Sequence, residues 1–237
     1  MKISLIIPAY NEEKYIGQCL DAVTKNACES LAEIIVVDNA STDRTSEIAK
    51  SFPNVRVVYE EKKGLTKARQ CGYNHAQSPI VAYIDADTKM PAQWLERIAQ
   101  EFENNQKVAC VSGPYIYHDI PKWQQFFVKL YWYLLAYPMY LIIGYMVVGG
   151  NFAIRKDTLI KMNGFDTTID FYGEDTNIAR RAHAFGKVLF KPSLYMFTSG
   201  RRFSGQGFIS TGKTYVINFV SEVVLKKPLT KSYKDIR

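Results

Sequence analysis

Short apolar runs alternate with amphipathic segments through the first 115 residues of the chain. The apolar runs have the length and composition of buried strands; they are Ile3–Ile7, Ile34–Val37, Val55–Tyr59, Ile80–Ile84 and Val108–Val111. Between the first two runs, Ile16, Leu20 and Val23 recur at helical spacing. Strands separated by helices predict right-handed crossovers and a mainly parallel sheet. The expected fold class is therefore an α/β/α sandwich.

Polar residues mark where the helices of this half are expected to begin. Asn11 can cap the first helix, with two glutamates in its first turn. The segment Ser41–Asp43 can cap a second helix that runs to Lys50. A third helix is expected over residues 65–76, and Pro91 suits the first position of a fourth.

The pattern after Gly149 is mixed. Two strands and two helices are expected there, namely strands at Phe152–Ile154 and Val188–Phe190 and helices at Asp157–Met162 and Glu174–Ala184. The remainder, through Phe219, is weakly periodic, and Arg201 and Arg202 lie in a loop-like setting.

The segment Leu130–Val148 contains 19 residues without a charge, which is barely the length of a membrane span. Pro138 and Gly144 interrupt it, and its tyrosines are scattered instead of gathered at its ends. The aromatic-rich character begins earlier, at Trp123–Lys129. Three interpretations stay open: a full span, a helix that lies at a membrane surface or contacts a lipid substrate, and an ordinary buried helix.

These patterns divide the chain into four regions. We expect alternating strands and helices at residues 1–115, a hydrophobic helical insert at 116–148, a mixed region at 149–222, and a basic tail at 223–237.

Composition places the chain among folded globular proteins, with 47% hydrophobic residues in 237. The net charge of +7 suits anionic partners such as diphosphates or anionic lipid headgroups. No RNA-binding or helix-turn-helix signature supports a nucleic-acid partner. The four cysteines form no CxxC pair, so reduced thiols and a cytosolic location are expected. The apolar run at the N-terminus is too short for a signal peptide, so export is not expected.

Acidic residues follow the fourth strand, where a parallel sheet binds its ligands. Asp85 and Asp87 flank one alanine, and in extended chain their carboxylates would point the same way. Such a pair can hold one Mg²⁺ or Mn²⁺ ion whose other ligands are water and phosphate. No G-x-G-x-x-G follows the first strand, which disfavours a dinucleotide-binding fold.

Further charged residues are candidates for chemistry. Glu174 and Asp175 stand at a helix start, where they could cap the helix or act as a general base. Lys67 and Arg69 lie two apart on one helix and are not expected to share a face, although either could reach a phosphate. The arginine pair at 201 and 202 suits bidentate phosphate contacts, or is a surface pair.

Taken in order, these motifs closely resemble family 2 glycosyltransferases of the GT-A fold. The resemblance covers residues 3 to about 203. Its motifs are Ile6–Glu12, Val36–Thr45, Gly64–Gln70, Asp85–Asp87, Gly149–Asn151, Asn163–Asp166 and Gly173–Asp175. One departure is Asn177, where many members carry a further acid.

The resemblance implies that residues 1–115 form a nucleotide-binding half and residues 149–222 an acceptor and catalytic half. It also implies a role for each matching position. The nucleotide pocket would be lined by Pro8, Ala9, Tyr10 and Glu12, and the base would be contacted by Asp38 and Arg69. Asp85 would lie near the ribose and the metal ion, Asp87 would bind that ion, and Gly150 and Asn151 would shape the sugar and acceptor side. Asp175 would be the base with Glu174 beside it, and Arg201 or Arg202 would hold the diphosphate.

The implied activity is inverting transfer of a sugar from a nucleoside diphosphate, most often UDP in such proteins, to an acceptor hydroxyl. The extensive hydrophobic insert favours an acceptor that is lipid-linked or a growing cell-surface polysaccharide, and a peripheral position on the inner face of the cell membrane. The alternatives are a nucleotidyltransferase and a non-catalytic partner that binds sugar nucleotides at a membrane.

Overall fold

The computed structural model describes residues 1–169, 173–207, 210–214, 217–218 and 221. Its centre is a seven-stranded sheet in the order β3-β2-β1-β4-β8-β6-β9. The strands are β1 (Ile3–Ala9), β2 (Leu31–Asp38), β3 (Val55–Tyr59), β4 (Ile80–Ile84), β6 (Val108–Ser112), β8 (Asn151–Arg155) and β9 (Lys187–Phe190). All neighbouring strands pair in parallel except at β8, which is antiparallel to both β4 and β6. The predicted mainly parallel sheet is confirmed.

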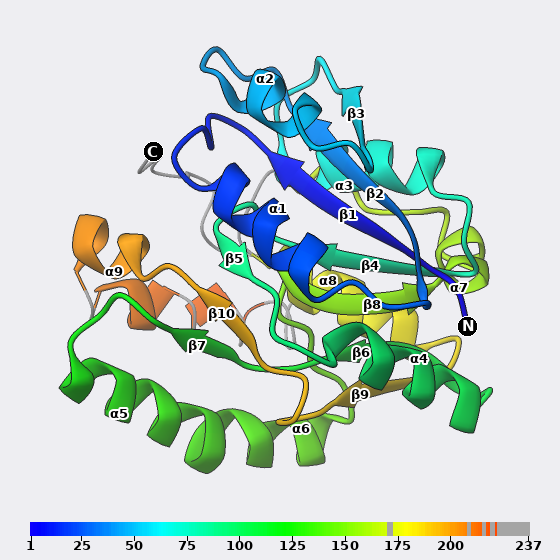
Figure 1. The fold of residues 1–237 in the computed structure, drawn as a ribbon. Helices are drawn as coiled ribbons and strands as arrows, with labels where there is room; N and C mark the ends of the chain where they lie inside the picture. Colours follow the sequence, from blue (N-terminus) through cyan, green and yellow to red (C-terminus); the bar gives the residue numbers. More distant parts are fainter. Residues whose placement is uncertain (170–172, 208–209, 215–216, 219–220, 222–237) are drawn as a thin grey trace.

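Helices cover both faces of this sheet (Figure 1). One face packs against α1 (Ile16–Lys25), α2 (Thr45–Lys50) and α4 (Trp94–Asn104). The other packs against α3 (Leu65–His75), α7 (Lys156–Lys161) and α8 (Glu174–His183). Within β2, Ile34 and Val36 face the first layer while Ile35 and Val37 face the second, as the twofold period of a strand requires. The α/β/α sandwich is therefore confirmed.

Two predicted helix starts are wrong. Asn11 does not cap α1, which begins at Ile16; it adopts φ 52° and its side chain accepts a hydrogen bond from the Thr42 amide instead. The fourth helix begins at Trp94 and not at Pro91, because Gln93 takes a left-handed conformation just before it.

A second, three-stranded sheet was not predicted. It consists of β5 (Thr88–Lys89), β10 (Met196–Thr198) and β7 (Tyr115–Tyr117), in that order. Strands of two or three residues are too short to give a periodic pattern. A helix, α9 (Arg201–Gln206), begins shortly after β10 and replaces the loop expected there.

A continuous helix runs over Lys122–Ile143, and we call it the aromatic helix. It comprises α5 (Lys122–Tyr131), a π-helical turn η1 (Trp132–Ala136) and α6 (Tyr137–Ile143). Pro138 does not break it, because the wider π turn just before the proline relieves the clash of its ring with the preceding turn. Gly144, at φ 84°, ends it. Figure 1 shows the helix along one side of the molecule, beyond β7.

All four cysteines are free, as expected. Burial raises the pKa of Cys19 to about 12, so this thiol stays protonated and unreactive. The basic tail at 223–237 lies outside the described residues.

Candidate functional site

A cavity of about 1070 Å³ opens at the edge of the sheet where the parallel strands end. Strands β1 and β2 both end at this edge, where Ala9 pairs with Asp38. The reversed strand β8 starts there, since Asn151 pairs with Ile84. The predicted site residues that line the cavity are Pro8, Ala9, Tyr10, Glu12, Lys67, Arg69, Asp85, Asp87, Gly150, Glu174, Asp175, Arg201 and Arg202.

Two predicted donor-binding residues, Asp38 and Asn151, do not line the cavity. Asp38 is buried, and its Oδ1 accepts a hydrogen bond from the Ser41 amide at 3.0 Å. Asn151 is buried as well; its Oδ1 accepts from Trp94 Nε1 at 2.9 Å, and its Nδ2 donates to three backbone carbonyl groups. In the described structure, both side chains hold the cavity wall in shape.

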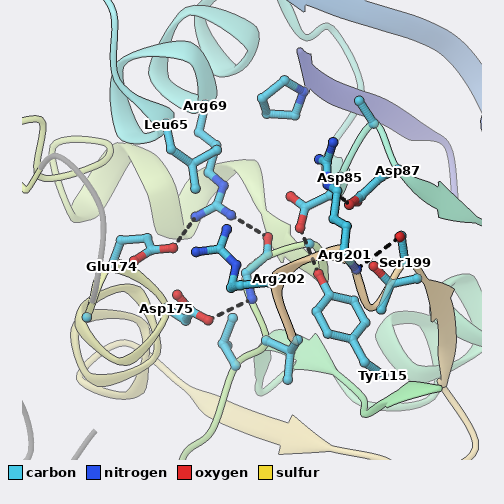
Figure 2. Close-up of a pocket in the computed structure, with 18 of the residues that line it drawn as sticks. Leu65, Arg69, Asp85, Asp87, Tyr115, Glu174, Asp175, Ser199, Arg201 and Arg202 are labelled. Atoms are coloured by element: carbon cyan, nitrogen blue, oxygen red, sulfur yellow. Dashed lines mark hydrogen bonds and ion pairs between the residues drawn. The ribbon is translucent and has the colours of Figure 1, made fainter. Parts of the chain in front are cut away.

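Asp85 and Asp87 lie in a turn after β4 and not in the extended chain that was expected, yet both side chains line the cavity. Asp85 Oδ2 accepts a hydrogen bond from the Tyr115 hydroxyl at 2.9 Å, and Asp87 Oδ2 lies 3.0 Å from Arg201 Nε (Figure 2). Burial raises the pKa of Asp87 to about 7, although Arg201 opposes the shift. Asp85 and Glu12 add to it by charge repulsion.

The acidic pair suits a hard divalent cation. Among the described residues, no three or more His, Cys, Asp or Glu side chains gather closely enough to hold a metal ion by themselves. Mg²⁺ and Mn²⁺ bind through few protein oxygens when phosphate and water supply the rest. Asp85 and Asp87 could therefore hold such an ion together with a bound diphosphate.

The backbone of Gly149 and Gly150, which we call the glycine pair, passes between Asp85 on one side of the cavity and Asp175 on the other. A Cβ atom on Gly150 would lie 2.1 Å from Asp85 Oδ2, and one on Gly149 would lie 2.7 Å from Arg69 Nη2. The Gly149 amide donates to Asp175 Oδ2 at 3.0 Å, and its carbonyl accepts from Arg69 at 2.7 Å. Only glycine leaves both acids room at this place.

Glu174 and Asp175 begin α8 on the opposite side of the cavity from Asp87 (Figure 2). Burial raises the pKa of Glu174 well above its usual range, and Asp175 raises it further. Arg69, which is fully buried, opposes this shift from 3.8 Å. Both Glu174 and Asp175 line the cavity.

Arg201 and Arg202 stand at the start of α9 and point to different parts of the cavity. Arg201 lies beside Asp87, whereas Arg202 reaches toward Arg69 and Asp175 (Figure 2). Arg201 and Arg202 give the cavity wall a cationic lining suited to phosphate. Four further basic side chains contribute to this lining, namely Lys63, Lys67, Arg69 and Lys213.

At the β1 end of the cavity, Lys63 Nζ donates to the Tyr10 hydroxyl at 2.8 Å. Lys67 and Arg69 both line the cavity, although helical spacing alone did not place them on one face. Both are accommodated because Lys67 is partly exposed near the opening while Arg69 is buried deeper in the wall.

Several lining residues were missed by the sequence analysis. Tyr115 holds Asp85, and Phe127, Tyr131 and Trp132 of the aromatic helix form an apolar side of the cavity. The alternation of Tyr115 and Tyr117 after a Gly-Pro turn was the available signal for the short strand that positions Tyr115.

The chain resembles several curated glycosyltransferases. Glycosyltransferase AglE of Haloferax volcanii is 42% identical over 101 residues, which are 40% of this chain and 33% of that protein. The glucosyl-dolichyl phosphate glucuronosyltransferase of the same organism is 23% identical over 185 residues, covering 73% of this chain and 59% of that protein. The chain thus spans only about a third of the length of AglE and less than two thirds of the second relative.

Solved structures share the fold. Staphylococcus aureus TarS 1–349 in complex with UDP-GlcNAc superimposes with a TM-score of 0.70 at 20% identity, covering 98% of this chain and 68% of that one. Mannosyltransferase PcManGT from Pyrobaculum calidifontis, in complex with GDP-Man and Mn²⁺, gives 0.65 at 21% identity, covering 91% and 64%. The sequence model for glycosyl transferase family 2 matches residues 4–162, well over half of the chain. The chain therefore belongs to glycosyl transferase family 2.

Proposed function

We propose that this chain transfers a sugar from a nucleoside diphosphate, UDP in the first instance, to an acceptor hydroxyl with inversion at the anomeric carbon. One observation carries the proposal: Asp85, Asp87 and Arg201 lie on one side of a single cavity, and Asp175 lies across the glycine pair on the other. A donor and an acceptor could meet between them. Complexes of structural neighbours with UDP-GlcNAc and with GDP-Man and Mn²⁺ support this.

Each side of the cavity has a task in this reaction. Asp87 and Asp85 would hold Mg²⁺ or Mn²⁺, which supplies Lewis-acid neutralisation of the leaving diphosphate. Arg201 and Arg202 add fixed positive charge where negative charge grows. Asp175 takes the proton from the acceptor hydroxyl as that oxygen attacks the sugar from the face opposite the diphosphate.

The test is a donor screen with the purified protein, in which UDP and GDP sugars are incubated with Mn²⁺ or Mg²⁺ and products are identified by mass spectrometry. Asp175→Asn should lower transfer about 10²–10⁴-fold while nucleotide affinity, measured by calorimetry, stays near that of the parent protein. Near-normal turnover of this variant would show that Asp175 is not the base. With pyrophosphate added, formation of a nucleoside triphosphate and a sugar 1-phosphate from the same donors, in place of a nucleoside diphosphate, would indicate a nucleotidyltransferase.

We further propose that the acceptor is lipid-linked and that the protein lies on the inner face of the cell membrane. The aromatic helix is long and apolar enough to cross a membrane, with a mean hydropathy of 1.4, and only 6% of it is buried. Its exposed side carries large apolar residues, among them Trp123, Phe126, Tyr133, Leu134, Leu135, Leu141 and Ile142. Such a surface is larger than soluble proteins normally leave open.

The packing of the aromatic helix favours the membrane-surface interpretation over a span. Ala136 and its neighbours Trp132 and Tyr140 pack against Phe190 of β9, so one side of the helix is held by the protein. A helix with one protein-facing side and one apolar side can lie in the interface plane. Because Tyr131 and Trp132 also line the cavity, a lipid-linked acceptor could enter beside them. The relative that acts on a glucosyl-dolichyl phosphate, by its name, supports this acceptor class.

A further inference from the structure

Arg201 links two acids of the cavity wall through all three of its side-chain nitrogen atoms. Its Nη1 and Nη2 donate to the two oxygens of Glu12 at 2.8 and 2.6 Å, and its Nε lies 3.0 Å from Asp87 Oδ2. The guanidinium also lies over the Tyr15 ring, 4.7 Å from its centroid. A fork–fork contact with one carboxylate and an ion pair with a second fix the position of this cation.

The acids that Arg201 holds are shielded from water. The Glu12 side chain is 6% exposed and that of Asp87 is 11% exposed. A charged carboxylate that is buried without a cation is strongly disfavoured, so the charged form of Asp87 needs a positive partner. In the described part of the ligand-free chain, Arg201 fills that place.

We propose that Arg201 is a built-in counter-ion that occupies Asp87 until a divalent cation and a diphosphate arrive together. Arginine cannot lose its charge, so a metal ion that approaches Asp87 is repelled while the guanidinium stays there. A diphosphate offers the guanidinium new oxygens and frees Asp87 for the metal ion. Metal ion and nucleotide therefore raise each other's affinity by the same factor. The part of this inference that involves the nucleotide rests on the proposed function; the competition for Asp87 does not.

The exchange is a movement of the side chain and not of the backbone. The Gly200 amide donates to Asp119 Oδ1 at 2.5 Å, and Ser199 Oγ donates to the other oxygen of that carboxylate at 2.5 Å. A Cβ atom on Gly200 would lie 2.0 Å from Ile120 Cγ2, so the chain is packed tightly just before Arg201. The start of α9 is held in place, while the long arginine side chain can turn from the acids toward the cavity.

The experiment measures Mn²⁺ binding by electron paramagnetic resonance or calorimetry, without any sugar donor. Arg201→Gln should bind Mn²⁺ alone about fivefold or more tightly than the parent protein, because the competing cation is gone. Addition of UDP should increase the Mn²⁺ affinity of the parent protein. The factor of this increase should be about fivefold smaller in Arg201→Gln. Arg44→Gln, which removes an exposed arginine–glutamate pair of 2.8 Å, should leave both affinities unchanged.

Arg201→Lys is the second variant, and circular dichroism checks that both variants fold. Lysine keeps the charge but cannot reach Glu12 and Asp87 with a fork, so its Mn²⁺ affinity should fall between those of the parent protein and Arg201→Gln. Mn²⁺ affinity that is unchanged or weaker in Arg201→Gln and Arg201→Lys would overturn the inference. The result with Mn²⁺ alone holds whether or not the donor screen finds a transfer activity.

Discussion

Gly150 lies against Asp85 so closely that a methyl group on its Cα would overlap the carboxylate, with its Cβ 2.1 Å from Oδ2. The same Cβ would lie 2.1 Å from the Tyr115 hydroxyl, which holds that carboxylate in place. The position of the acid that follows β4 therefore depends on a residue without a side chain just before β8.

Gly150→Ala should displace Asp85 and lower the proposed transfer about 10–100-fold, since a shift of about 1 Å at a reacting site has effects of this size. Initial rates at saturating donor measure the effect. Gly17→Ala, on helix α1, is the matched control, because a Cβ atom there would meet only Ile48, at an ordinary contact distance of 3.7 Å. Equal rates for both variants would show that Asp85 tolerates the displacement.

Asn151→Ala should destabilise the fold by about 2–4 kcal/mol, because the loss of this side chain leaves the buried Trp94 Nε1 and several carbonyl groups without partners. Urea unfolding followed by fluorescence gives the free energy. Asn74→Ala removes an exposed asparagine of α3 and should change it little. A small change in Asn151→Ala would mean that water satisfies these groups.

The free energy of unfolding should fall as pH rises, and Glu174 should account for part of that fall. Its carboxyl group titrates near 4.5 when unfolded, and burial raises its pKa well above that in the folded chain. The stabilising contribution of its protonated form is thus full below pH 4.5 and is lost as pH rises through the folded-state pKa.

Glu174→Gln should therefore flatten the pH dependence of the unfolding midpoint above pH 4.5. Thermal melts at intervals across that range measure it. Glu96→Gln, on the exposed side of α4, is the control and should keep the dependence of the parent protein. A steeper slope in Glu174→Gln would contradict the assignment.

The aromatic helix should bind anionic phospholipid vesicles through its open side. Leu134→Glu combined with Ile142→Glu alters side chains that are 67% and 80% exposed. The change should weaken vesicle binding more than tenfold, because burial of each apolar side chain contributes about 1.5 kcal/mol or more. Flotation assays measure this. Ile160→Glu, on helix α7 and 56% exposed, should bind like the parent protein. Equal losses in both would exclude the aromatic helix as the contact.

The regular half of the fold was predictable because its strands are rich in apolar residues, and β1, β4 and β6 are buried along their whole length. The ends of β3 and β4 were predicted to the residue. Asn11 was misplaced because the polar residues after β1 bond to the loop after β2, a contact that local sequence does not encode. Most of the candidate site followed from polar residues at strand ends, which topology brings to one edge.

Other parts of the site depend on contacts between distant segments. The pairing of Arg201 with Glu12 joins residues 189 positions apart, and no spacing rule predicts it. Asn151 was taken for a ligand-binding residue because buried and ligand-facing polar groups look alike in sequence. Its hydrogen bonds to Trp94 and Leu194 become visible only when the chain is folded.

The reversed strand β8 also sets the order in which the molecule can be completed during synthesis. It stands between β4 and β6, yet it leaves the ribosome after both of them. The growing chain must keep an open edge on β4 until residues 151–155 arrive to bridge the halves. The glycine pair enters with the same segment, and α8 and α9 follow it, so the acidic cleft can be completed only after β8 has been synthesised.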